Sequence, residues 1–181
     1  MYSFGRTIIL FTNMKGLKIM KITQILQKMI AFSGGNIHDI DHLIRVWTYA
    51  KTIGELECLD KESQYILEVA AIVHDIACPL CREKYGNTNG KYQEEEGSRM
   101  VKTFLADTDM TKEQIDRVSY LVGHHHTIQN IEGVDYQILI EADYIANASE
   151  NGYTDENIRN FIENVSKTKA GKQLMAEIFL I

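Results

Sequence analysis

The scarcity of proline constrains this chain more than any other feature of its sequence. Pro79 is the single proline among 181 residues, whereas an average composition of about 5% would give about nine. Because proline interrupts helices and punctuates the turns between short strands, its scarcity favours long helices over a sandwich of many strands. Apolar residues supply 45% of the chain, which is enough for a hydrophobic core.

Helical periodicity accounts for most of the sequence, so we predict an all-α fold of seven or eight helices in one domain. Asn36 and Asp60 stand where helix caps are expected, and Thr111 forms a capping box with Gln114. Residues 78–90, which include a Gly-Asn-Thr-Asn-Gly cluster, are predicted to form a loop. The predicted helices cover residues 17–32, 36–59, 60–77, 92–106, 111 to near 124–126, 135–149, and two shorter segments that begin near 155 and 169.

The overall charge and the longest apolar run limit the partners of the chain. The 19 basic and 25 acidic residues give a net charge of 19 − 25 = −6. An acidic surface repels phosphate backbones, so a nucleic-acid duplex is not an expected partner. The longest aliphatic run covers residues 69–73, far short of the roughly 20 residues of a membrane span, so no membrane partner is expected. The three cysteines are an odd number, which indicates free thiols and a cytoplasmic location.

The first residues carry a short apolar stretch, Ile8 to Phe11, between Arg6 and Lys15. This stretch is shorter than the apolar segment of a signal peptide, and no clear small-residue cleavage site follows it. We therefore interpret residues 1–19 as an N-terminal arm or an extended start, and residues 20–181 as the folded domain.

Histidines and acids recur in the segments predicted to form the core. His38 and His42 are four residues apart, so they share one helix face. His74 and Asp75 follow each other at the end of an apolar helix. Burying an imidazole beside an ionised carboxylate costs several kcal/mol unless a partner compensates, and a divalent cation compensates well.

Three consecutive histidines end the fifth predicted helix, and an acid interrupts the apolar face of the sixth. At about 100° per residue, His125 falls near the centre of the apolar face, His126 at its edge and His124 on the far side, towards solvent. Asp143 lies within an otherwise buried segment that includes Ile145. His125, His126 and Asp143 are therefore candidates for an internal polar site.

Together these residues carry a family resemblance. The segment Asp41-His42-Leu43-Ile44-Arg45-Val46, the doublet His74-Asp75 and the later Asp143 resemble the HD-domain metal-dependent phosphohydrolases. The separations are 32 residues from His42 to His74 and 68 from Asp75 to Asp143. The resemblance covers roughly residues 20–165, is strongest to small single-domain bacterial members, and implies a single helical HD domain.

The resemblance implies that His42, His74, Asp75 and Asp143 bind one divalent metal. Two imidazoles and two carboxylates suit Mn, Fe, Ni, Co or Zn, with Mg also open. The implied function is a metal-dependent phosphohydrolase in which metal-activated water attacks a small phosphorylated substrate, with a nucleotide among the candidates. Whether the substrate is a monoester or a diester stays open. The alternative is a non-catalytic regulatory HD protein that binds a metal or a nucleotide.

Some HD enzymes hold a second metal with a further histidine in the fourth helix and a His-His pair in the fifth. Here Gln93 stands at the likely position of the further histidine, although Glu94 or Glu96 stay open as substitutes. His125 and His126 match the remaining pair. We predict one metal per chain and leave the second open. The Gly-Tyr-Pro motif of cyclic-dinucleotide phosphodiesterases is absent after His126.

Further candidates for chemistry lie close to the proposed ligands. Glu83 could relay protons and Lys84 could bind a phosphate, so we predict catalytic roles for these two residues together with Asp75 and His125. The residues that we predict to contact substrate are His38, Arg45, Arg82 and His126.

The motif Cys78-Pro79-Leu80-Cys81 invites a zinc or redox interpretation. A zinc site needs a second ligand pair, and a thioredoxin-type motif needs a strand–helix context. The sequence offers neither, so we interpret this motif as incidental.

Overall fold

The structure is a computed structural model that describes residues 21–181, so the predicted arm at residues 1–19 lies outside the described residues. Within residues 21–181 the chain forms helices and no strands, which confirms the predicted all-α class. The helices are α1 (Ile22–Phe32), α2 (Ile37–Leu56), α3 (Lys61–Val73), α4 (Cys78–Tyr85), α5 (Gly90–Leu105), α6 (Lys112–Val122), α7 (Val134–Asn151), α8 (Asp155–Asn164) and α9 (Lys169–Phe179).

Side-chain caps set the starts of several helices, as the sequence predicts. The Asn36 side chain accepts a hydrogen bond from the Asp39 amide at 3.3 Å, and α2 begins at the next residue. Asp60 accepts hydrogen bonds from two amides of the first turn of α3. Thr111 and Gln114 form the predicted capping box at the start of α6. These contacts satisfy amides that have no partner within the helix.

The prediction of a loop over residues 78–90 is wrong for its first part, because residues 78–85 form α4. Pro79 lies in the first turn of this helix, where the missing N–H group would have had no intrahelical partner. The helix ends at Gly86, whose φ of 70° lies in the left-handed region that favours glycine. Residues 86–89 form the shorter connection to α5.

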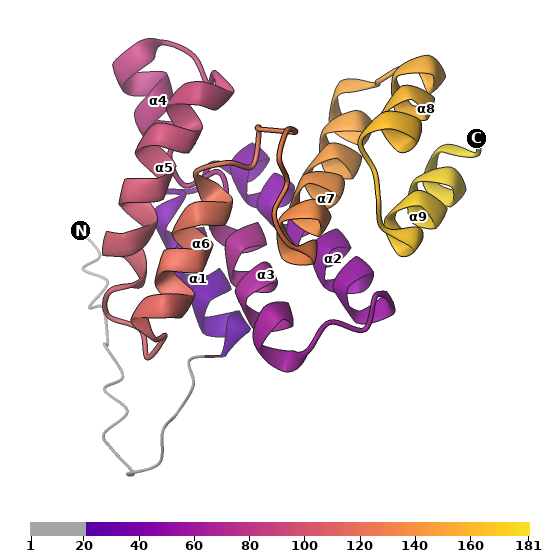
Figure 1. Cartoon of the computed structure of the whole chain (residues 1–181). Coiled ribbons are helices and arrows are strands. Elements are labelled where there is room, and N and C mark those ends of the chain that lie inside the picture. Colours follow the sequence, from indigo (N-terminus) through magenta and orange to yellow (C-terminus); the bar gives the residue numbers. More distant parts are fainter. Residues whose placement is uncertain (1–20) are drawn as a thin grey trace, which may run out of the picture.

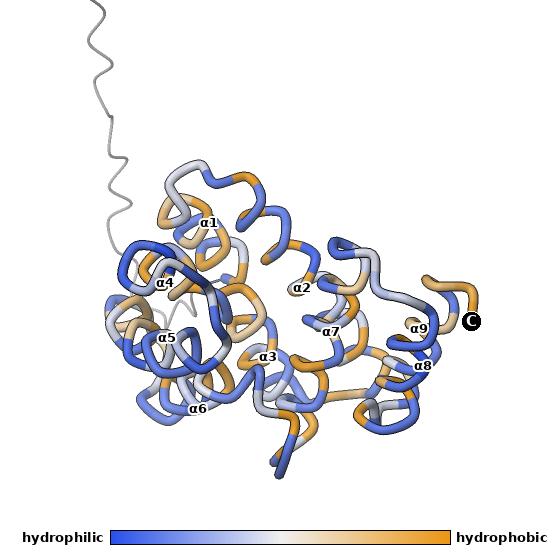
Figure 2. The backbone as a smooth tube through the Cα atoms, turned by 90° about the horizontal axis from the view of Figure 1, so that it is seen from above, coloured by the Kyte–Doolittle hydropathy of each residue, from blue (hydrophilic) through white to orange (hydrophobic). Residues whose placement is uncertain are grey.

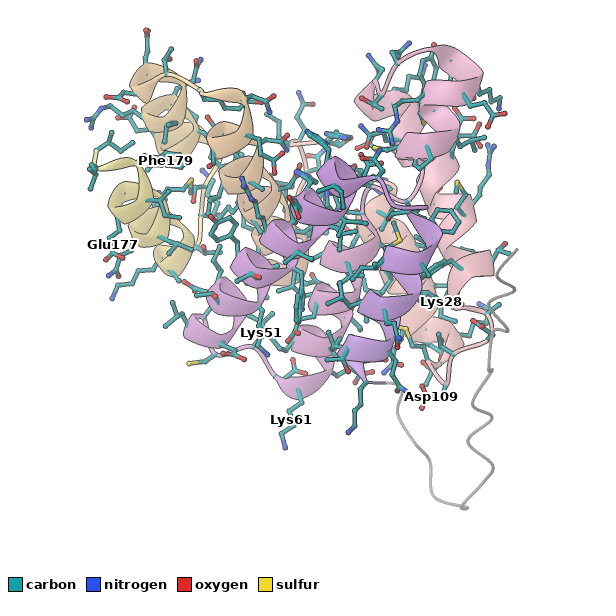
Figure 3. All side chains as sticks on the ribbon, turned by 180° about the vertical axis from the view of Figure 1, so that it is seen from behind. Lys28, Lys51, Lys61, Asp109, Glu177 and Phe179 are labelled. Carbon is teal, nitrogen blue, oxygen red and sulfur yellow. The ribbon has the colours of Figure 1, made fainter. Side chains whose placement is uncertain are left out.

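Helices α2, α3 and α7 form the centre of the molecule, with α2 packed on both α3 and α7. Figure 1 shows α4 and α5 on one side of this centre and α8 and α9 on the opposite side. The same division is visible from behind, where the labelled Lys61 points away from the packed helices (Figure 3). The end of α4, the connection after it and the start of α5 are largely hydrophilic (Figure 2). Residues 66–73 of α3 are all buried and supply the middle of the core.

One stretch of the described residues, Lys61–Tyr85, is long and apolar enough to pass a length-and-composition test for a membrane span. Of its most apolar window, 67% is buried inside the structure. Burial of this kind is expected for a central core helix, and α3 supplies most of the stretch.

Candidate metal centre

Four side chains from three parts of the chain meet beside the central helices. His42 comes from α2, Asp143 from α7, and His74 and Asp75 from the turn after α3. The two histidine Nε2 atoms are 3.2 Å apart, and Asp143 Oδ1 lies 3.2 Å from His42 Nε2 and 3.5 Å from His74 Nε2. Asp75 Oδ2 lies 3.7 Å from each of the two Nε2 atoms.

The outer nitrogens of both rings are held by acceptors, which fixes the state of the inner nitrogens. His74 Nδ1 lies 2.8 Å from the Ala71 carbonyl, and His42 Nδ1 lies 2.9 Å from Glu150 Oε2. A carbonyl or carboxylate oxygen can only accept, so both Nδ1 atoms carry the hydrogen and donate it. In the neutral rings, each Nε2 therefore presents a lone pair to the centre, as a metal ligand requires.

A second group of side chains shares Asp75. His125 Nε2 lies 3.5 Å from Asp75 Oδ1, and neither of these buried atoms has a hydrogen-bond partner among the described residues. His125 Nδ1 donates to the Val122 carbonyl at 2.7 Å, so the Nε2 lone pair faces the carboxylate. One potential ligand atom from each of Asp75, His125 and His126 lies within 4.8 Å of the others.

The donor set fits a divalent cation. Three imidazole lone pairs and two carboxylates face one another, and all of them are acceptors that need a proton or a metal between them. Two ligand nitrogens that are each about 2.0–2.1 Å from a shared ion lie about 3–3.5 Å apart, which matches the 3.2 Å between His42 and His74. This His/Asp cluster could therefore hold a metal, and the mixed nitrogen and oxygen donors suit a transition metal.

The cluster keeps its carboxylates ionised. Burial opposes ionisation of Asp75 and Asp143, but the surrounding imidazoles outweigh burial and hold the pKa of each carboxyl below its ordinary value. Burial also lowers the pKa of His42, yet the hydrogen bond with Asp143 and the charge of Asp75 outweigh it and raise this pKa to about 9. Without a metal, His42 therefore holds a proton at neutral pH, and a metal that binds there must displace it.

The cluster opens into a hollow of about 180 Å³, here called the polar hollow. Arg82 lines it and forms a two-pronged ion pair with Asp39, in which one nitrogen–oxygen distance is 3.2 Å. Asn147 donates to Asp143 Oδ1 at 2.8 Å and so orients this carboxylate from one turn further along α7. The polar hollow is lined by His38, Asp39, His42, Asp75, Cys78, Arg82, Thr88, Gln93, His126, Asp143, Asn147, Glu150 and Asn151.

Of the residues predicted to contact substrate, His38, Arg82 and His126 line the polar hollow, and Arg45 does not. His38 is at the rim, with its side chain 81% exposed. Arg45, on α2, forms an ion pair with Glu150, with 3.7 Å between Nη1 and Oε1.

The three consecutive histidines follow α6 in a turn. His125 is buried, as the angular argument predicts. His124 is half-buried beside the Tyr120 ring, which corrects the expectation that it faces solvent.

Glu83, which we predicted to relay protons, and Lys84, which we predicted to bind a phosphate, do not line the polar hollow. Glu83 is exposed, and Lys84 forms an ion pair with Glu96 at 2.7 Å. The hydrogen bond with Glu96 raises the pKa of Lys84. Cys78 and Arg82 are the residues of this short helix that line the polar hollow, and Arg82 is the charged one.

The three candidates for a further ligand on α5 have other partners. Gln93 lines the polar hollow, where its oxygen accepts from the Cys78 thiol at 3.3 Å and its amide donates to the Thr88 carbonyl at 2.8 Å. Glu94 accepts from the His126 amide at 3.0 Å, and Glu96 is paired with Lys84.

Two functional candidates were missed by sequence analysis, namely Glu150 and Asn147. Both follow Asp143 on α7, at offsets of seven and four residues, which place them on the same face of the helix as Asp143. That spacing is the signal that could have found them. Asn147 contacts Asp143, four residues before it, whereas the partner of Glu150 could not be read from spacing, because His42 is 108 residues away.

The protein is thus an all-α domain built around a His/Asp cluster that could hold a metal. A family model described as HD domain matches residues 39–160, and the chain belongs to the HD-domain family. HD domains bind divalent metals, in agreement with the donor set described above. No curated protein matches the chain.

A solved structure shares this architecture. It is the crystal structure of a predicted HD superfamily hydrolase from an uncultured Thermotogales bacterium, with a TM-score of 0.62. The two sequences are 19% identical, and the similarity covers 88% of this chain and 83% of that one. At this level of identity the likeness concerns the fold.

Proposed function

We propose that this HD-domain protein is a metal-dependent phosphohydrolase that hydrolyses a small phosphorylated molecule. The proposal is supported above all by the cluster of acceptors formed by His42, His74, Asp75 and Asp143. All of them except His74 line the polar hollow. A divalent metal at such a site supplies positive charge that neutralises phosphoryl oxygens and acidifies water. In the reaction, the oxygen of water forms a new bond to phosphorus, the bond from phosphorus to the leaving oxygen breaks, and a proton of the water passes to that oxygen.

Other residues of the chain orient the metal ligands or bind the phosphate. Glu150 and the Ala71 carbonyl orient the imidazoles of His42 and His74, and Asn147 orients Asp143. The Arg82 guanidinium lines the polar hollow and is 41% exposed, so it can bind a phosphate through two parallel hydrogen bonds. Binding of a phosphate there requires Arg82 to exchange its pairing with Asp39 for the substrate.

We also propose a partner and a cellular location for the protein. A small phosphorylated molecule, rather than a nucleic-acid duplex or a membrane, is the proposed partner, because the polar hollow holds about 180 Å³. A cytoplasmic location is supported by the three cysteines, all of which are free thiols.

The test is phosphate release from nucleoside mono-, di- and triphosphates and sugar phosphates by metal-stripped protein supplied with Mn, Co, Ni or Mg. We expect release that depends on the added metal and is lost in His74→Ala. His124→Ala is the matched control, because its Nδ1 is bound to the Tyr120 carbonyl outside the cluster. A chain that binds metal stoichiometrically and releases no phosphate from the panel would instead be the regulatory metal- or nucleotide-binding protein.

His125 distinguishes one metal from two. If the chain holds one metal, His125→Ala keeps the metal content and lowers turnover or substrate affinity. If the second group of side chains also holds a metal, the same variant loses one of two bound ions. Elemental analysis of the purified variant therefore decides the stoichiometry.

A further inference from the structure

A second hollow of about 240 Å³ adjoins the polar hollow and shares three of its residues, His126, Asp143 and Asn147. We call it the aromatic subsite. Its remaining walls are mostly apolar and come from α7, α8, the connection between these two helices and the segment after α6. These other lining residues are His125, Ile128, Ile140, Tyr144, Tyr153 and Phe161.

Flat rings dominate one side of the aromatic subsite. Tyr144 is stacked on Phe161 with centroids 3.6 Å apart and an interplanar angle of 8°, and Tyr153 meets Tyr144 at 61°. Two apolar side chains are open to solvent, since Tyr153 is 39% and Ile128 54% exposed. The polar hollow, by contrast, contains no tyrosine, phenylalanine or tryptophan among its lining residues in the described part of the chain.

The two hollows also differ in the basic residues that line them. Arg82 lines the polar hollow, whereas the aromatic subsite has no arginine or lysine among its lining residues within 21–181. Asp143 and His126 lie at the boundary, so a molecule that spans both hollows passes directly over the cluster. Ligand sites of small molecules measure about 300–1,000 Å³, a range that neither hollow reaches alone and that the two reach together.

We propose that the aromatic subsite binds a flat, largely apolar ring on the leaving group of the substrate, such as a nucleobase, while the polar hollow binds the phosphate. The inference rests on the proposed function, because it assigns the two hollows to two ends of one phosphate ester. Stacking and edge contacts with aromatic side chains recognise any such ring with little dependence on its polar edge.

Binding of two matched ligands tests this assignment. Adenosine 5′-monophosphate and ribose 5-phosphate differ by the base alone, and calorimetry on the metal-loaded protein gives a Kd for each when the ester oxygen is replaced by a CH2 group that blocks hydrolysis. We expect the nucleotide to bind about tenfold more tightly, because stacking of a base is typically worth this factor or more. Ile128→Ser and Tyr153→Ser should each weaken nucleotide binding about three- to tenfold and leave ribose 5-phosphate unchanged.

Ile178→Ser is the matched control, since Ile178 is an exposed isoleucine on α9 that lines neither hollow. Equal Kd values for the two ligands, or equal losses for both in the Ile128 and Tyr153 variants, overturn the aromatic subsite. Phosphate release is measured in parallel. A preference for the nucleotide without phosphate release refutes the proposed function and leaves the subsite standing, whereas release without any preference refutes the subsite alone.

Discussion

Glu141 and Asp143 are buried acids two residues apart on α7, and we predict opposite consequences for their removal. Glu141 is fully buried, and its Oε1 accepts from the amides of Lys167 and Thr168 at 2.7 and 3.1 Å. Glu141→Ala leaves both amides without this partner. Each orphaned buried donor costs about 1–3 kcal/mol, so the free energy of unfolding should fall by about 2–6 kcal/mol.

Urea denaturation of the EDTA-treated protein, followed by circular dichroism, measures this loss. Glu141→Gln keeps one acceptor oxygen in the same space and should cost less than Glu141→Ala, which keeps the test informative if the alanine variant does not fold. Both variants should bind metal as the unmodified protein does while they are folded.

Asp143→Asn provides the contrasting variant, because the amide keeps the shape of the side chain and removes a carboxylate from the cluster. It should change the unfolding free energy of the metal-free protein by less than Glu141→Ala does, and it should lose the metal. If Glu141→Ala unfolds at the same urea concentration as the unmodified protein, or if Glu141→Gln stays folded and loses metal, then the division between a structural and a metal-binding acid is wrong.

Three further outcomes follow from the site. Arg82→Ala should lower phosphate release more than Lys84→Ala, because Arg82 lines the polar hollow and Lys84 is paired outside it; equal rates for the two variants would contradict this. In EDTA-treated protein, the raised pKa of His42 stabilises the folded state. This stabilisation is complete below the ordinary histidine pKa of 6.5 and is lost as the pH rises through about 9. The urea midpoint should therefore fall over that range in the unmodified protein and less in His42→Asn. Gly90→Ala should lower phosphate release, since a new Cβ would lie 2.7 Å from the His126 ring and displace it. An unchanged rate would show that phosphate release does not depend on the position of this ring.

Local signals in the sequence predicted much of the fold. Helix starts depend on one capping side chain and the next few amides, so Asn36, Asp60 and Thr111 identified their helices. Helix α4 was missed because Pro79 suggests a break, although proline is compatible with the first turn of a helix. The glycine that ends α4 belongs to the cluster that suggested a loop.

The candidate site was predictable only where its residues form a motif. The motif brought together His42, His74, Asp75 and Asp143, and the structure brings the same four side chains into contact range. The contact of Glu150 with His42 depends on how α2 crosses α7, which no local pattern encodes. Lys84 is close in sequence to the proposed ligands His74 and Asp75, but this did not place its side chain in the polar hollow. Successive residues of a helix point in directions about 100° apart, so a neighbour in sequence can face away from the site.

The divalent-metal content of the purified protein shows whether the His/Asp cluster is a metal site. We expect close to one transition-metal ion per chain by elemental analysis after reconstitution, and none in His74→Ala or Asp75→Ala variants that retain the circular dichroism spectrum of the unmodified protein. His124→Ala should keep the full complement. An unmodified protein that takes up no metal after reconstitution, or a folded His74→Ala variant that takes up as much as the unmodified protein, would contradict the assignment of this cluster.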